Sequence, residues 1–134
     1  MAVNLFAVTL DCPAPAKLAR FYQGFLGGRV SVAPEEDFAV LVLDDDFPVR
    51  IDFQLAANPA PPAWPDPRSP RRHHLEFAVD DGLDDMERRL RELGATVPAH
   101  QPGGAEFRVF ADPSGHLFCI APRAATYVRD EPHE

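Results

Sequence analysis

Apolar and polar residues alternate in a stretch near the start of the chain and again past its middle. Because successive side chains of a β-strand point to opposite faces, this alternation predicts two half-buried strands. The first strand covers residues 3–10, with Val8 and Leu10 on its apolar face. The second covers residues 73–79, and its polar face carries His74, Glu76 and Ala78.

Each predicted strand is followed by an amphipathic helix that ends at a glycine. The first helix has apolar residues at the spacing of a buried helix face, namely Leu18, Phe21, Tyr22, Phe25 and Leu26. The second helix has a similar apolar stripe, formed by Leu83, Met86, Leu90 and Leu93. Gly27 and Gly94 stand directly after these stripes, where a residue that tolerates positive φ commonly ends a helix.

Three further strands are predicted after each helix, because short apolar runs lie between turn residues. Their bounds are 29–33, 38–43 and 49–56 in the first half, and 95–99, 106–111 and 117–121 in the second. The chain therefore divides into two βαβββ modules, residues 3–56 and 73–121, with a proline-rich linker at 57–72. This order predicts an α+β fold, and 134 residues with 46% hydrophobic content suit a single domain over 1–134.

The two modules align as an internal repeat. Matching the two helix-ending glycines sets an offset of 67 residues, which places Ala7 opposite His74. The last strands match at an offset of 65 residues, which places Gln54 opposite Cys119. We attribute the difference to a two-residue deletion in the loops between the helices and the last strands.

The charge of the chain argues against two classes of partner. Thirteen basic and twenty-one acidic residues give a formal net charge of −8, which repels the phosphates of nucleic acids and anionic membrane surfaces. No stretch reaches the roughly 20 apolar residues of a membrane-spanning helix, and the first residues lack the pattern of a secretion signal. We therefore expect a cytoplasmic protein whose two cysteines are thiols.

Several short motifs resemble those of the vicinal oxygen chelate superfamily, which includes glyoxalases, extradiol dioxygenases and bleomycin-resistance proteins. They are AKLARFY at 16–22, LG at 26–27, HLEFAVDD at 74–81, LGA at 93–95 and DPSGH at 112–116. The proline-rich segment around Trp64 resembles the glyoxalase-like subgroup. The resemblance implies tandem βαβββ modules that form a cupped, mostly antiparallel eight-stranded sheet, and it also implies a homodimer.

The same resemblance implies a divalent metal on the concave face of the sheet. The family's ligand positions correspond here to Ala7, Gln54, His74 and Cys119, and a complete site would carry imidazoles and carboxylates there. Only His74 keeps the family's residue type, so we expect no cofactor. The alternative is zinc or a similar ion bound by His74 and Cys119 with help from Gln54 or Glu76, because imidazole and thiolate suit such ions.

Two residues on the polar face of the strand at 73–79 are candidates for catalysis. Glu76 or His74 could act as an acid or base on a substrate. Alternatively, His74 hydrogen-bonds an organic ligand, and Glu76 pairs with Arg108 or Arg50. Cys119 could be a nucleophile that His74 activates, but we favour an inert cysteine in the cleft wall.

The linker carries one tryptophan and a run of arginines. Trp64 could cap the cleft, lie in a subunit interface, or hold the linker against the domain. Arg68, Arg71 and Arg72 could attract an anionic substrate, but we interpret them as a solvated charge run.

The sequence favours a glyoxalase-like or bleomycin-resistance-like protein that binds a small organic molecule without a complete four-ligand metal site. The predicted cleft residues are Gln54, Trp64, His74, Glu76, Arg108 and Cys119. The net negative charge suits a cationic or polar ligand. The alternatives are a lyase or isomerase with a reduced metal site, and an interaction module with no small-molecule ligand.

Overall fold

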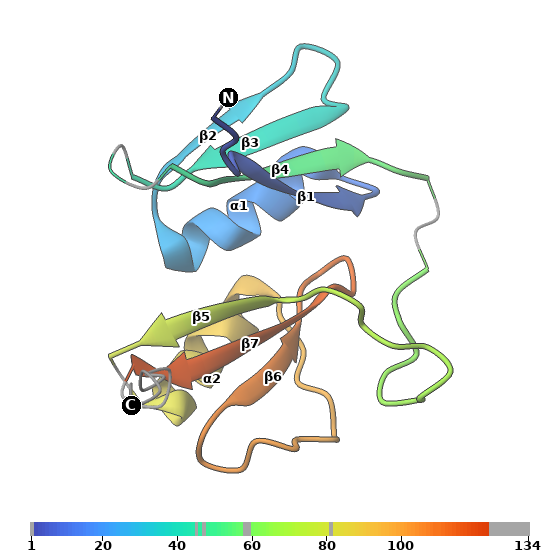
Figure 1. Cartoon of the computed structure of the whole chain (residues 1–134), viewed down its shortest axis with the longest axis vertical. Helices are drawn as coiled ribbons and strands as arrows, with labels where there is room; N and C mark the ends of the chain where they lie inside the picture. Colours follow the sequence, from blue (N-terminus) through green and yellow to red (C-terminus); the bar gives the residue numbers. More distant parts are fainter. Residues whose placement is uncertain (1, 45, 47, 58–59, 81, 124–134) are drawn as a thin grey trace. The chain divides into compact units, whose positions relative to one another are not determined.

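The fold is described from a computed structural model of the chain, which places all residues except 1, 45, 47, 58–59, 81 and 124–134. The chain divides into two compact units (Figure 1). Unit 1 contains residues 1–61 and 112–114, and unit 2 contains residues 62–111 and 115–134. The boundary after residue 61 falls inside the predicted linker.

Unit 1 is a four-stranded sheet with one helix packed against it. Its elements are β1 (Ala7–Cys12), α1 (Pro15–Leu26), β2 (Arg29–Val32), β3 (Phe38–Val42) and β4 (Arg50–Leu55). The strand order is β1-β4-β3-β2, with β1 parallel to β4 and the other pairs antiparallel. The predicted βαβββ order of the first module is therefore confirmed.

The core of unit 1 lies between α1 and this sheet. The predicted apolar stripe of the helix supplies buried residues, including Leu18 and Tyr22, and the sheet supplies Leu41 and Phe53. The rings of Tyr22 and Phe53 lie 5.8 Å apart between their centroids. The helix ends as predicted at Gly27, whose φ of 74° is in the left-handed region that glycine adopts without strain.

A buried hydrogen bond ties α1 to the short segment Asp112–Ser114. The Tyr22 hydroxyl donates to Asp112 Oδ2 over 2.7 Å, and the two residues are 0% and 4% exposed. Asp112 Oδ1 also accepts a hydrogen bond of 2.9 Å from the Ser114 backbone N–H. Burial, followed by the negative charge of Asp112, raises the pKa of Tyr22 well above its ordinary value.

Unit 2 repeats the strand-helix-strand order with one strand fewer. Its elements are β5 (Leu75–Val79), α2 (Leu83–Leu93), β6 (Arg108–Ala111) and β7 (Leu117–Pro122). The strand order is β5-β7-β6, with β5 parallel to β7 and β6 antiparallel to β7. The second helix stop is confirmed as well, because Gly94 has a φ of 116°.

The predicted strand at 95–99 is wrong. Only one isolated bridge, between Thr96 and Ala111, lies in this stretch. Pro98 has no N–H to donate to a strand ladder. In place of a strand, the Gln101 side-chain amide accepts from the Val109 N–H over 2.8 Å and donates to the Val109 carbonyl over 2.9 Å. The described residues therefore form seven strands in two sheets rather than the expected eight.

The first strand also begins later than predicted, at Ala7 rather than at residue 3. Its partner β4 begins at Arg50, directly opposite Ala7, so residues 3–6 have no strand beside them to extend the ladder. Phe6, which was expected on the apolar face, is 63% exposed. The Arg50 guanidinium covers its ring at 5.1 Å from the centroid.

The strand ladders correct the alignment of the two modules. They contain the pairs Asp11↔Gln54 in unit 1 and Glu76↔Cys119 in unit 2. Residues 65 positions apart therefore occupy matching places in both the first and the last strands. The counterpart of His74 is Thr9, and not Ala7 as the helix ends suggested. The second module therefore has two residues more than the first between its first strand and its helix end, and two fewer between its helix end and its last strand.

Candidate functional site

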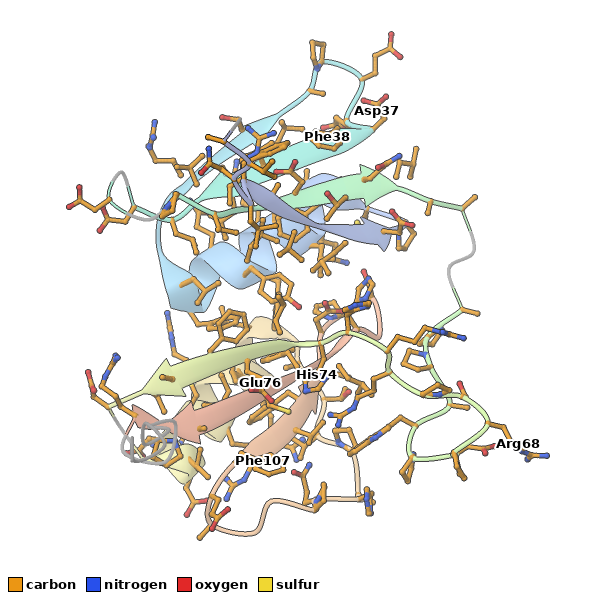
Figure 2. All side chains as sticks on the ribbon, viewed as in Figure 1. Asp37, Phe38, Arg68, His74, Glu76 and Phe107 are labelled. Carbon is orange, nitrogen blue, oxygen red and sulfur yellow. The ribbon has the colours of Figure 1, made fainter. Side chains whose placement is uncertain are left out.

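Three of the predicted site residues come together in unit 2. Glu76 on β5 lies directly opposite Cys119 on β7, and His74 lies two residues before Glu76, so strand periodicity gives the three residues one face. His74 Nε2 and Glu76 Oε1 are 3.2 Å apart, and Figure 2 shows the two side chains together at the start of β5. The possible metal-binding atoms of all three residues lie within 4.8 Å of one another.

Cys119 forms the floor of this cluster and is only 3% exposed. Arg71 Nη1 donates a hydrogen bond to its sulfur over 3.8 Å. Burial raises the pKa of the Cys119 thiol, the positive charge and hydrogen bond of Arg71 partly oppose this rise, and the Glu76 carboxylate adds to it. A thiol with a raised pKa is a weak nucleophile at neutral pH. This agrees with the interpretation of Cys119 as an inert wall residue.

Arg71 is fixed in place by the tryptophan of the linker. Its guanidinium lies over the Trp64 ring, 4.7 Å from the centroid. On the same ring, His100 makes an edge contact with a centroid distance of 5.1 Å. Because a guanidinium can contact an aromatic ring and still donate through its N–H groups, Arg71 can bind Trp64 and donate a hydrogen bond at the same time.

Two open hollows lie beside the cluster, both within unit 2. The first has a volume of about 410 Å³, and its lining includes Trp64, Arg71, Arg72 and His74 with three prolines and Asp66. The second has a volume of about 470 Å³ and is lined by Arg72, His73, His74, Leu75 and Glu76. Arg72 and His74 belong to both hollows, so these two residues join them.

The first hollow carries excess positive charge. Its single carboxylate, Asp66, is held by Arg68 through contacts of 3.2 and 3.1 Å to the guanidinium and 2.9 Å to the backbone N–H. These hydrogen bonds lower the pKa of Asp66. Arg72 is exposed and has a φ of 64°, which is costly for a residue other than glycine. Neither Arg71 nor Arg72 forms an ion pair with a carboxylate among the residues that the structure describes.

Arg108 does not join the predicted site. Its Nη1 contacts Asp84 Oδ1 at 2.9 Å and Glu87 Oε1 at 3.3 Å, and both carboxylates belong to α2. The ladder explains this placement, because Arg108 pairs with Ile120 and Cys119 is one position away on the opposite face. Glu76 is therefore a neighbour of His74 rather than of Arg108.

Gln54 belongs to unit 1, where it is exposed on β4 opposite Asp11. Arg50, the other basic residue considered as a partner of Glu76, forms a two-contact ion pair with Asp52 on its own strand, at 2.8 and 3.2 Å. The cluster in unit 2 thus consists of His74, Glu76 and Cys119.

Sequence reasoning missed the role of Arg71. It lies in a charge run, but the linker folds into successive turns that bring it back to the tryptophan. Backbone bonds of 2.9 Å join Asp66 to Ala63 and Ser69 to Asp66, and the Ser69 hydroxyl accepts a 2.8 Å bond from the Ala63 N–H. The sequence does contain a feature that favours a compact loop over an extended linker, namely the many proline and turn residues between Trp64 and Arg71.

The cluster can be tested for the divalent metal that the resemblance implies. Imidazole, carboxylate and thiolate are all zinc ligands, with bonds of about 2.0–2.3 Å that place ligand atoms about 3.3–3.8 Å apart in a tetrahedral site. Atoms within 4.8 Å of one another reach this geometry with small side-chain movements. His74, Glu76 and Cys119 therefore fit a three-ligand zinc site, although the Arg71 guanidinium beside the sulfur opposes a second cation there.

Comparisons with known proteins are consistent with this architecture. A family model for a glyoxalase-like domain matches residues 7–121. No curated protein matches the chain significantly. Among the described residues, no helix is long and apolar enough to cross a membrane.

Several solved structures have a similar fold. A possible glyoxalase from Bacillus cereus is 17% identical, with coverage of 90% of this chain and 99% of that chain and a TM-score of 0.64. A glyoxalase/bleomycin resistance protein/dioxygenase family enzyme from Burkholderia phytofirmans is 18% identical, with coverage of 90% and 98% and a TM-score of 0.66. The fosfomycin resistance protein FosX from Listeria monocytogenes, in complex with Mn(II) and 1S,2S-dihydroxypropylphosphonic acid, is 17% identical, with coverage of 90% and 90% and a TM-score of 0.66. At these identities the likeness establishes the fold alone.

Proposed function

Because the chain belongs to the glyoxalase-like domain family of the vicinal oxygen chelate superfamily, we propose that it binds a small organic molecule, without a metal, in the first hollow of unit 2. The observation that carries this proposal is the position of Arg71. Its guanidinium contacts both the Trp64 ring and the Cys119 sulfur. The positive charge of Arg71 therefore lies beside the Cys119 sulfur, which a metal ion would need as a ligand.

The hollow has the features of a binding site for a small molecule. Its volume of about 410 Å³ is within the range of about 300–1,000 Å³ that is typical of ligand pockets. Trp64 and the prolines give it rigid apolar walls, and Arg71, Arg72 and His74 provide a few polar groups. Such a combination lets apolar contact supply affinity while the polar groups fix the orientation of the ligand.

Metal analysis and ligand screening test this proposal directly. Protein purified without a chelator is expected to contain no stoichiometric metal, and dialysis against EDTA is expected to leave ligand binding unchanged. Trp64 is the only tryptophan of the chain, so its fluorescence reports on the hollow itself. A compound at about 100 times its Kd should also stabilise the protein by about 2.7 kcal/mol.

The contrary outcomes are specific. Stoichiometric metal that is lost in His74→Ala but kept in a control variant, His116→Ala, would contradict metal-independent binding. If a broad set of metabolites and drugs changes neither the fluorescence nor the melting temperature, the interaction module is the better interpretation.

The second candidate function is a lyase or isomerase with an atypical metal site, which the His74, Glu76 and Cys119 cluster favours. In that case His74, Glu76 and Cys119 would hold a zinc ion, which would supply the polarisation of a substrate oxygen. Cobalt(II) provides a readout other than activity, because a cobalt-thiolate bond absorbs in the near ultraviolet. The metal site predicts this absorption in the wild type and its loss in Cys119→Ser.

A further inference from the structure

We propose that the ligand of the first hollow is an organic oxyanion, a carboxylate or a phosphate ester, held by Arg71 and Arg72. This inference rests on the proposed function and names its ligand class. It differs from the expectation of a cationic or polar ligand that the net charge of −8 suggested.

The first argument is that, among the described residues, these two arginines lack the carboxylate partners that six other arginines have. At least six other arginines form ion pairs with carboxylates, namely Arg50, Arg68, Arg88, Arg91, Arg108 and Arg123. Arg71 and Arg72 are adjacent and, among the described residues, have no carboxylate partner of this kind. Two guanidinium groups without counter-ions attract an anion to the hollow that they line.

The second argument is preorganisation. The Arg71 guanidinium lies over the Trp64 ring, and the bond to Cys119 takes only one of its five N–H donors. A fixed guanidinium loses little conformational entropy when it accepts a ligand. Planar, paired N–H donors also match the geometry of carboxylate and phosphate oxygens better than other cationic side chains do.

The third argument concerns the charges that would oppose an anion. Among the described residues, Asp66 is the only carboxylate that lines this hollow, and Arg68 binds it. Glu76 lines the second hollow instead, where its carboxylate faces His74. Solvent screens the exposed charges that lie more than about 8 Å away at physiological ionic strength. The local field can therefore favour an anion although the net charge is negative.

Matched aromatic probes test this inference on the metal-free 134-residue chain. Phenyl phosphate and benzoate carry the oxyanion, benzyl alcohol is neutral, and benzylamine is cationic. Trp64 fluorescence gives the Kd of each probe at constant ionic strength. We expect at least one of the two anions to bind at least 10-fold more tightly than benzyl alcohol and benzylamine.

Two variants locate the effect. Arg72→Gln is expected to weaken binding of the preferred anion at least 10-fold. Arg88→Gln, which makes the same charge change on the exposed face of α2, is the control and should change the Kd of this anion less than twofold. Arg71→Gln should also weaken binding, and circular dichroism would show whether each variant is folded. If Arg72→Gln and Arg71→Gln both fold and both keep the wild-type Kd, the inference is wrong.

The probes also separate failure of this inference from failure of the proposed function. If benzyl alcohol or benzylamine binds more tightly than both anions, the hollow is a ligand site but the ligand class is wrong. If no probe and no compound of the broad screen changes the fluorescence, both the proposed function and this inference are wrong.

Discussion

Replacement of Tyr22 by phenylalanine removes one oxygen atom from the buried bond to Asp112. The wild-type bond is 2.7 Å long, between residues that are almost completely buried. A hydrogen bond to a charged group contributes about 1.5–3 kcal/mol, because its loss leaves the charge less well solvated. Asp112 keeps its bond from the Ser114 N–H, so we expect Tyr22→Phe to lower the free energy of unfolding by about 2 kcal/mol.

Urea unfolding followed by far-ultraviolet circular dichroism measures this loss. Asp112→Asn provides the matched background, because asparagine keeps the size of the side chain and a carbonyl acceptor but removes the charge. Since a neutral bond contributes about 0.5–1.5 kcal/mol, Tyr22→Phe should cost less in that background, by about 1 kcal/mol. A cost below about 0.5 kcal/mol in the wild-type background would refute the reasoning, since the carboxylate would then be solvated without the hydroxyl.

Two further predictions concern unit 1. The pKa of Tyr22 is raised in the folded protein, so above about pH 10 the unfolded chain loses a phenol proton that the folded chain keeps, and the free energy of unfolding should fall with rising pH. Urea titrations on both sides of this pH should show a smaller fall for Tyr22→Phe than for the wild type. Equal falls would contradict the assignment of this pH dependence to Tyr22. Gly28→Ala should cost at least about 1 kcal/mol more than Gly27→Ala, because a Cβ at Gly28 would overlap the Val42 carbonyl oxygen whereas Gly27 has nothing within 4 Å. Both glycines have positive φ, so the comparison of their melting temperatures isolates the clash.

Local patterns were enough to predict the two helices and the glycines that end them. The apolar stripe on α1 and the glycine after it specify a helix and its end within about a dozen residues, without reference to the rest of the chain. The face shared by His74 and Glu76 also follows from strand periodicity alone. Their closeness to Cys119 was predicted only through the family resemblance, because the pairing of β5 with β7 joins residues that are far apart in the sequence.

The failures have a common physical origin, because each depends on partners that local patterns do not contain. The stretch 95–99 has strand-like composition, but Gln101 takes the place beside Val109. The alternation of faces along β6 was predicted correctly, but the register of β6 with β7 decides which residues of β7 share a face with Arg108. The position of Arg71 depends on how the loop after Trp64 turns back.

The Gln101 amide has a consequence for the behaviour of the protein at high concentration. β6 is an edge strand of its sheet, and exposed edges can pair with strands of other molecules and start aggregation. Gln101 occupies both hydrogen-bonding groups of Val109, at the middle of this short edge. Together with the backbone bridge between Thr96 and Ala111, the Gln101 side chain thus occupies the groups of β6 to which a foreign strand would bind, in place of a regular fourth strand.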